Sequence, residues 1–352
     1  MLPSNSSMPS QPERPRSSRP SSHGDRSFDG LVTTDVELTV ERLHGGGLAA
    51  IPTETVYGLA ADAERVAAVA RIFEVKGRPP SHPLIVHLAD PETIHDGWIN
   101  SSSEPHVIQA VDRLAAACWP GPLTILVPRG PRALDAVTGA RSTIGIRVPA
   151  HPDAQRILGM FGGGLAMPSA NRYGRVSPTT AEHVIADLGA LLDPQRDIVF
   201  DGGRSAVGVE STIVDLASWP PQILRAGAID AAAIASILSV ELDGASGPSR
   251  ASGMLSGHYA PECVVALADT SGAARLVADQ HLALAKRVRV LDRTDDVVRA
   301  AFELYNDLRA ADSEGVDVLV VVLPRAEGVG HAVRDRLFKA AAGSGRRTSP
   351  GD

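Results

Sequence analysis

The sequence has few aromatic residues and only two cysteines, and it lacks the signature motifs of several common enzyme classes. Phe, Trp and Tyr make up 4% of its 352 residues, so aliphatic side chains must fill its cores. Cys118 and Cys263 form no ligand pattern, which argues against a zinc site and fits a reducing compartment. Because no G-x-x-x-x-G-K-[ST] or G-x-S-x-G motif occurs, neither a phosphate loop nor a serine nucleophile elbow is supported.

Long apolar runs and an excess of positive charge are also absent. The longest strongly apolar run, Val318 to Leu323, is too short to span a bilayer. With 41 acidic and 34 basic residues the net charge is -7, which argues against a broadly basic nucleic-acid surface or a membrane-surface helix. We therefore expect a cytoplasmic protein with no membrane association and no stable nucleic-acid binding. Any phosphate binding must depend on a local cluster of cations.

The length favours two domains flanked by tails. Residues 1–28 hold nine serines and five prolines without apolar periodicity and are predicted to be disordered. Residues 29–238 form the first predicted domain. Periodicity disappears in the predicted linker, residues 239–262. Three apolar runs then alternate with helical patterns over residues 263–342, which indicates a small parallel, Rossmann-like sheet, and residues 343–352 read as a tail.

The stretch from Leu48 to Leu88 is the centre of the first domain. Its pattern predicts a strand at Leu48–Ile51, a polar loop, a helix capped by Asp62 and ended by Gly77, and a second strand at Leu84–Leu88. Hydroxyls, a carboxylate, cations and an imidazole therefore leave the ends of neighbouring elements.

Lys76 and Arg78 flank the glycine at the predicted helix end. A mobile ammonium beside a planar guanidinium is a combination that clamps phosphates. Basic residues at this position also complement the helix dipole without binding a ligand. The polar groups on the neighbouring elements favour the anion site.

A second predicted strand, Ser142 to Val148, carries Arg147 among apolar residues. A buried arginine requires a partner, which is either an internal carboxylate or an anionic ligand. The residue pattern leaves both open.

Polar residues also precede a predicted helix that begins near Thr180. Thr179 and Glu182 match a capping box, and a helix N-terminus also presents free N–H groups to an anion. Ser169 and Asn171 lie in the turn before it and, taken alone, would be ordinary turn residues.

Nine motifs occur in the order that is typical of one enzyme family. They are PTETVYGL, KGRP, PLIVH, WPGPLT, TIGIRVP, PSAN, SPTTAEHV, ESTIVD and ILRAG. In this combination the chain resembles the threonylcarbamoyl-AMP synthase family, whose catalytic part is a YrdC-like domain. HYAP, FELYNDLRAAD and GVGHAVRDRLFKAAAG resemble the linker and second domain of the long form, so the resemblance covers about residues 29 to 343.

The resemblance implies an α/β fold with a YrdC-like twisted open sheet and helices, plus a smaller Rossmann-like C-terminal domain. It implies that L-threonine, bicarbonate and ATP give threonylcarbamoyl-AMP and pyrophosphate. The product would supply threonylcarbamoyladenosine formation in tRNA, where separate transferase machinery moves the group. Mg²⁺ would accompany ATP, with no metal site on the protein, and no covalent enzyme intermediate is needed.

The resemblance also implies the site residues. Those expected to bind ATP are Lys76, Arg78, His82, Thr143, Ser169, Asn171, Thr179, Arg225 and Tyr259, with Lys76 and Arg78 as the catalytic candidates. Those expected to hold threonine are Thr55, His87, Arg147 and Ser211. The chemistry agrees, because a guanidinium such as that of Arg147 binds a carboxylate in a bidentate manner, whereas Arg78 and the helix start at Thr179 suit phosphate.

Three features depart from the family pattern. His82 stands where Asn is usual, Tyr173 replaces a small residue, and the linker sequence SGMLSGHYAP lacks the proline, lysine and first tyrosine common there. The third departure bears on whether the linker contacts ATP. The alternative function is a non-catalytic RNA- or nucleotide-binding protein of YrdC-like fold, against which the acidic net charge and the threonine residues count.

The segment from Ser252 to Pro261 is expected to act as a lid over the nucleotide, hinged by Gly253 and Gly257. A labile mixed anhydride gains from exclusion of water until release. A passive linker is the alternative, since Gly and Ser richness alone indicates only flexibility. His258 and Tyr259 favour the lid, because both side chains can reach phosphate or ribose.

Overall fold

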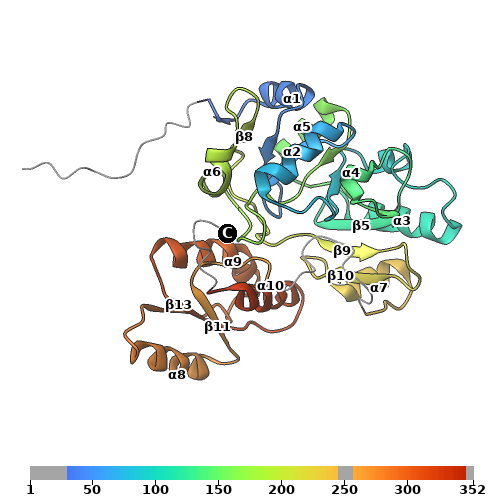
Figure 1. The fold of residues 1–352 in the computed structure, drawn as a ribbon. Helices are drawn as coiled ribbons and strands as arrows, with labels where there is room; N and C mark the ends of the chain where they lie inside the picture. Colours follow the sequence, from blue (N-terminus) through green and yellow to red (C-terminus); the bar gives the residue numbers. More distant parts are fainter. Residues whose placement is uncertain (1–29, 245–256, 346–352) are drawn as a thin grey trace, which may run out of the picture.

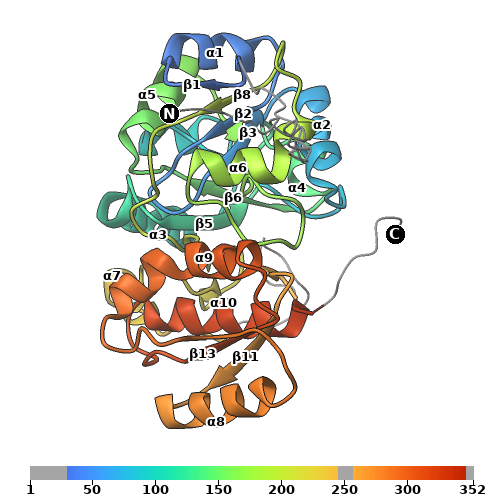
Figure 2. The same cartoon turned by 90° about the vertical axis from the view of Figure 1, so that its left-hand side faces the viewer.

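The computed structural model describes residues 30–244 and 257–345, which form two α/β domains. In Figure 1 the smaller domain, drawn in orange and red, lies below the larger one, and Figure 2 shows the same arrangement from the side. Some predicted features lie outside the described residues: the tail at residues 1–28, the hinge Gly253 and the end of the C-terminal tail from residue 346.

The larger domain is built on one mixed sheet, which in the described residues has ten strands. In order across the sheet they are β1 (Val32–Thr33), β8 (Ile198–Phe200), β2 (Ala49–Ile51), β3 (Gly58–Asp62), β7 (Leu165–Ala166), β4 (Ile85–His87), β6 (Thr143–Arg147), β5 (Leu123–Pro128), β9 (Thr212–Asp215) and β10 (Gln222–Arg225). The sheet carries the α-helices α1 (Val36–His44), α2 (Val66–Lys76), α3 (Pro105–Cys118), α4 (Asp135–Thr138), α5 (Pro152–Phe161), α6 (Ala181–Leu188) and α7 (Ala231–Leu238), and the short 3₁₀ helices η1 (Pro91–His95) and η2 (Gly189–Leu191).

Both faces of this sheet are buried, and adjacent residues of β2 and β3 show it directly. Ala50 and Leu59 belong to one hydrophobic cluster, whereas Ala49, Ile51 and Ala60 belong to another. Successive side chains of a strand point to opposite faces, so the two clusters lie on opposite sides of the sheet. This two-layer cover agrees with the predicted open sheet with helices.

The smaller domain has the predicted alternation of strands and helices. Its elements are β11 (Val264–Ala268), α8 (Ser271–Leu282), β12 (Val288–Leu291), α9 (Val297–Ser313), β13 (Val318–Val322) and α10 (Gly330–Gly343). The strands pair in parallel in the order β11-β13-β12. Helices α9 and α10 lie between this sheet and the larger domain, while α8 covers the far side (Figures 1 and 2). The prediction of a small parallel sheet is confirmed.

Two local predictions were wrong. Asp62 does not cap α2, because the helix begins after Arg65, and the Asp62 carboxylate instead accepts a hydrogen bond from the N–H of Glu64 at 2.9 Å. Thr179 is not the cap of α6. The Oγ1 of Thr180 accepts from the N–H of His183 at 3.3 Å, so the cap lies one residue later than the capping-box pattern indicates.

The two domains share a buried interface. Val56, Val176 and Val209 of the larger domain pack in one cluster with Leu304 and Leu337 of the smaller domain. Within the described residues, three ion pairs join the two domains: Arg204 with Glu303 at 2.7 Å, Arg309 with Asp187 at 2.7 Å and Arg336 with Glu210 at 2.9 Å. An interface that combines an apolar cluster with paired charges holds two domains in a defined orientation.

A buried ion pair in the larger domain gives a stability prediction. The fully buried Asp197 carboxylate accepts two hydrogen bonds from Arg71, at 2.7 and 2.8 Å, and one each from the N–H groups of Leu48 and Asp193. Asp197→Ala should lower the free energy of unfolding by about 3 kcal/mol, because it leaves a cation and buried N–H groups without partners. Urea unfolding near neutral pH measures this loss.

Acid should remove the same contribution. Burial opposes ionisation of Asp197, but the Arg71 pair and the backbone N–H groups outweigh it and lower the pKa. A carboxylate with a lowered folded-state pKa stabilises the fold above its unfolded pKa, and this stability is lost as pH falls through the folded pKa. The difference between wild type and Asp197→Ala should therefore shrink in strong acid. The control is Arg156→Ala, which removes an exposed pair with Asp153 and should cost less than about 1 kcal/mol.

Candidate functional site

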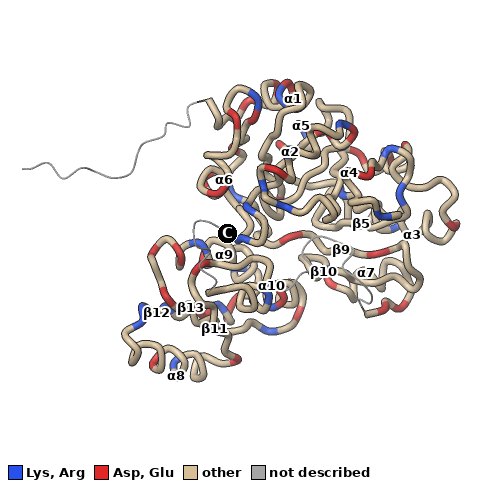
Figure 3. The backbone as a smooth tube through the Cα atoms, viewed as in Figure 1, with Lys and Arg blue, Asp and Glu red and all other residues tan. Residues whose placement is uncertain are grey.

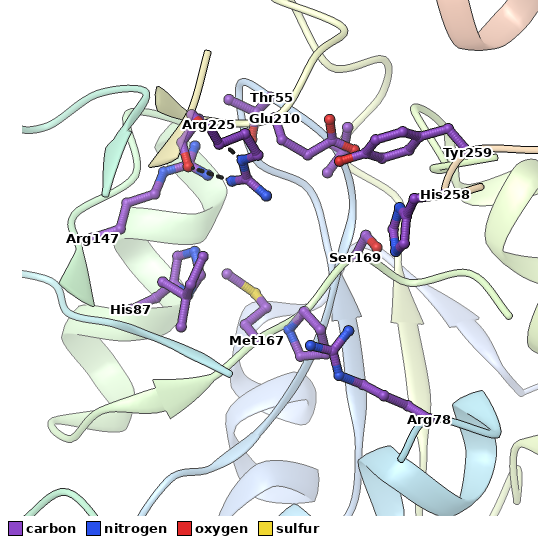
Figure 4. A pocket seen from close by; sticks show the side chains of 14 residues that line it. Thr55, Arg78, His87, Arg147, Met167, Ser169, Glu210, Arg225, His258 and Tyr259 are labelled. Carbon is purple, nitrogen blue, oxygen red and sulfur yellow. Dashed lines mark hydrogen bonds between the residues drawn. The ribbon is translucent and has the colours of Figure 1, made fainter. Parts of the chain in front are cut away.

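One pocket collects most of the predicted site residues (Figure 4). Its lining includes the predicted residues Thr55, Arg78, His87, Arg147, Ser169, Ser211, Arg225 and Tyr259. Figure 4 shows Arg147 and Arg225 on one side and Arg78 on the opposite side, with Met167 between them. Segments far apart in the sequence therefore bring three arginines to one pocket.

Arg147 and His87 are neighbours on paired strands, at the ends of β6 and β4. Arg147 is 5% exposed; its Nη2 donates to Oε1 of Glu54 at 2.6 Å and its Nε to the carbonyl of Gly121 at 3.3 Å. The internal carboxylate that the sequence left open is thus Glu54. Because the arginine also lines the pocket, an anionic ligand can share the guanidinium with this carboxylate.

His87 is a neutral, buried imidazole. Burial, followed by the charge of Arg147, lowers its pKa well below the ordinary range. Its Nδ1 has no hydrogen-bond partner within the described residues. A buried polar atom without a partner costs free energy, so this ring is suited to a hydrogen bond with a bound ligand.

Arg225 holds Ser211 in place by hydrogen bonds to its carbonyl and its hydroxyl. Its Nε donates to the Ser211 carbonyl at 3.0 Å and its Nη2 to Ser211 Oγ at 2.9 Å, while Thr124 Oγ1 lies 2.7 Å from the same hydroxyl. Ser211 and Arg225 are both buried, and burial lowers the pKa of Arg225. These contacts hold the Ser211 hydroxyl and the Arg225 cation in fixed positions in the pocket that Arg147 also lines.

Arg78 and Lys76 have different surroundings. Arg78 lines the pocket, donates from Nη2 to the carbonyl of Pro83 at 2.9 Å and lies over the ring of Tyr173, 5.8 Å from its centre. Burial lowers its pKa to about 10, so it stays a cation at neutral pH. The Lys76 ammonium instead donates to the carbonyls of Ser169 and Asn171, each at 2.5 Å, and does not line the pocket. It holds the turn that carries Ser169.

The remaining predicted ATP residues lie outside the pocket lining. Asn171 is buried in its turn, where its Nδ2 donates to the carbonyls of Arg172 and Arg175, each at 2.8 Å. Thr179 is buried before α6, and Thr143 begins β6. His82 Nδ1 lies 3.0 Å from the Tyr173 hydroxyl, so two departures from the family pattern contact each other.

His258 and Tyr259, at the described end of the linker, complete the lining of the pocket (Figure 4). The Tyr259 ring stacks on that of Tyr305 with centres 5.6 Å apart, and its backbone has a φ of 66°, a left-handed conformation that costs a non-glycine residue energy. Burial raises the Tyr259 pKa to about 12 and lowers that of His258 to about 3. Within the described residues, the Tyr259 hydroxyl and His258 Nδ1 have no hydrogen-bond partners.

Two carboxylates were missed by the sequence reasoning. Glu54 pairs with Arg147, and Glu210 lines the pocket between Ser211 and the smaller domain. Each lies directly before a residue that is expected to bind threonine, Thr55 in PTETVYGL and Ser211 in ESTIVD. This position is the signal that could have found them.

The pocket offers no cage for a metal ion. No group of three His, Cys, Asp or Glu side chains capable of holding one occurs in residues 30–244 or 257–345. Glu54 is paired with Arg147 and Glu210 with Arg336, so neither carboxylate is left for an ion.

The fold and pocket define a two-domain α/β protein with a pocket that is lined by three arginines. Two family models cover the chain: Sua5_yciO_yrdC, described as telomere recombination, matches residues 41–227, and the threonylcarbamoyl-AMP synthase C-terminal domain matches residues 229–342. The chain belongs to the threonylcarbamoyl-AMP synthase family.

Named relatives agree over most of the chain. It is 35% identical to the threonylcarbamoyl-AMP synthase of Pyrococcus abyssi, across 87% of this chain and 94% of that protein. Identity to the enzyme of Bacillus subtilis is also 35%, across 90% and 96%. The crystal structure of P. abyssi Sua5 complexed with L-threonine matches with a TM-score of 0.81 and 33% identity, covering 88% of this chain and 94% of that one. The predicted fold class is confirmed.

Proposed function

We propose that this protein is an enzyme that makes threonylcarbamoyl-AMP from L-threonine, bicarbonate and ATP and releases pyrophosphate. The observation that carries the proposal is that every residue expected to hold threonine (Thr55, His87, Arg147 and Ser211) lines one pocket with Arg78, Ser169, Arg225 and Tyr259 of the ATP set. The relationship to a structure that contains L-threonine supports the same substrate.

The threonine end of the pocket would be formed by Arg147, His87 and Ser211. The Arg147 guanidinium would bind the carboxylate of the amino acid, with Glu54 holding it in position. Neutral His87 offers a hydrogen bond without adding charge, and the hydroxyls of Thr55 and Ser211 match a polar substrate side chain.

The nucleotide end would lie toward Arg78 and the linker. Arg78 keeps its charge when buried and would bind phosphate, and the hydroxyl of Tyr259 would bind phosphate or ribose. Lys76 would act by holding the turn of Ser169 and Asn171. Contacts of ATP with His82, Thr143, Asn171 and Thr179 are also part of the proposal, although these residues lie outside the pocket lining.

The chemistry needs positioning more than it needs a reactive side chain. The threonine amine and bicarbonate form a carbamate and water, and a carbamate oxygen then attacks the α-phosphorus while pyrophosphate leaves. Positioned cations stabilise the charge that develops on the phosphates. Mg²⁺ bound to ATP would add to that stabilisation.

The distribution of charged residues argues against a non-catalytic RNA-binding role. Figure 3 shows Lys and Arg interspersed with Asp and Glu along both domains, whereas an RNA-binding surface needs a continuous basic region.

We further propose that the product supplies a separate tRNA-modifying transferase in the cytoplasm. No helix in the described part of the chain has the length and apolar character needed to cross a membrane.

Pyrophosphate release tests the proposal. The purified protein should release pyrophosphate from ATP only when L-threonine and bicarbonate are both present, because the carbamate must form before the α-phosphorus is attacked. A coupled pyrophosphate assay with each substrate omitted in turn measures this requirement. Equal release without threonine would contradict the proposal, and retention of RNA by a protein that releases no pyrophosphate would favour the binding alternative.

A further inference from the structure

Glu210 is a pocket residue whose carboxylate is held by the other domain. Its Oε1 accepts a hydrogen bond from Ser177 Oγ at 2.6 Å. Its Oε2 accepts from the Tyr305 hydroxyl on α9 at 2.6 Å and from Arg336 Nε on α10 at 2.9 Å. Two side chains of the smaller domain, Tyr305 and Arg336, thus bind the carboxylate of a residue that lines the pocket.

The contacts are buried and the carboxylate is ionised. Tyr305 and Arg336 are 0% exposed. Burial opposes ionisation of Glu210, but the charges of Arg336 and Arg225 and the hydrogen bonds from Ser177 and Tyr305 outweigh it and lower the pKa to about 2. Removing one member of a buried hydrogen-bonded charge network is costly, because it leaves the other members without their partners.

The same two residues also hold the linker tyrosine. The Arg336 guanidinium lies over the ring of Tyr259, 5.4 Å from its centre, and the Tyr305 ring stacks on the same ring with centres 5.6 Å apart. Figure 4 shows the side chains of Glu210 and Tyr259 near each other at the edge of the pocket. Arg336 and Tyr305 therefore both contact two neighbouring residues of the pocket lining, Glu210 and Tyr259.

Glu210 is covalently next to Ser211, whose hydroxyl is held by Arg225 and Thr124. The chain before it is also pressed against α9, because a Cβ added to Gly208 would lie 2.6 Å from the carbonyl oxygen of Ala301. A shift of the smaller domain at this point would displace Ser211 and Tyr259 together.

We infer that Arg336 and Tyr305 are positioning residues of the smaller domain, which hold Glu210 and Tyr259 and thereby set the pocket for threonine. This inference rests on the proposed function. It gives the C-terminal domain a specific part in the reaction: it completes the substrate pocket through one ionised carboxylate.

The alternative is that these residues only dock the domains. The interface contains a matched control, since Glu303 lies on the same helix as Tyr305 and pairs across the interface with Arg204, outside the pocket lining. Arg334 is the control for Arg336, because it lies on α10 and its Nη1 donates to the carbonyl of Pro324 within the smaller domain.

The test compares the full-length variants Tyr305→Phe, Arg336→Lys and Arg336→Met with Glu303→Gln and Arg334→Met. The KM and Kd for threonine should rise several-fold in Tyr305→Phe and roughly tenfold or more in Arg336→Met, with partial rescue in Arg336→Lys. Both controls should stay within about twofold of wild type. If Arg336→Met does not fold, Tyr305→Phe, which removes one hydroxyl, decides the question.

Two results would overturn the inference. One is a threonine KM and Kd in Tyr305→Phe equal to those of wild type. The other is an equal rise in Glu303→Gln, which would mean that domain docking alone matters. Absence of threonine binding by the wild type would be a different failure, because it would overturn the proposed function and this inference with it.

Discussion

Replacement of Arg147 by alanine will remove threonine binding and slow synthesis by roughly tenfold or more, since a charged transition-state contact contributes about 2 to 4 kcal/mol. The effect should be large because the change removes a cation from the pocket and leaves the buried Glu54 carboxylate without its partner. The pocket would then repel the carboxylate of threonine. Calorimetric titration with threonine, together with the rate of pyrophosphate release, measures both effects.

A double variant separates binding from folding. Arg147→Met with Glu54→Gln removes both charges of the pair, so it should restore thermal stability without restoring threonine binding.

Arg78→Ala should slow synthesis to a similar extent but leave threonine affinity within about twofold, because Arg78 is expected to bind the nucleotide. Weakened threonine binding in Arg78→Ala with normal binding in Arg147→Ala would reverse the assignment of the two ends of the pocket.

Loss of the linker side chains should have the second large effect. A full-length protein with His258→Ala and Tyr259→Phe should fold, yet form threonylcarbamoyl-AMP at a rate lower by roughly tenfold or more. The reason is that these groups close one side of the pocket, and their polar atoms lack hydrogen-bond partners within the described residues. Without them water should reach the mixed anhydride.

The diagnostic quantity is product formed per pyrophosphate released. It should fall in the linker variant, because the anhydride hydrolyses to AMP before release. Glu262→Gln is the control, since it changes an exposed partner of Arg175 at the end of the linker and should leave the ratio unchanged. An unchanged ratio and rate in the double variant would mean that the linker is passive.

The sequence predicted elements best where the apolar pattern is strong. In the smaller domain, β11 and β13 are continuous runs of Val, Leu and Ala, and β12 is interrupted only by Arg289; all three were found with nearly correct bounds. In the centre of the larger domain, Gly58–Asp62 was not recognised as a strand. Its glycine and alanines have low β-propensity, and only pairing with β2 and β7 makes it a strand.

The site shows the same limit. The motifs pointed to most of the residues that line the pocket, because hydroxyls and cations follow strand ends that the fold brings together. They did not reveal that Glu54 pairs with Arg147, or that Arg336 reaches Glu210 from another domain. Such partners are far apart in the sequence, and a local pattern carries no information about which distant side chain will be opposite.

The identity of the nucleotide product tests the proposed synthesis most directly. The protein is incubated with ATP, L-threonine and ¹³C-labelled bicarbonate, and the products are resolved by mass spectrometry. We expect an adenylate that contains threonine and a single labelled carbon, formed in step with pyrophosphate by the wild type and slower by roughly tenfold or more in Arg147→Ala. An adenylate that contains threonine but no label, or pyrophosphate release that yields only AMP at the earliest times, would contradict the proposed synthesis.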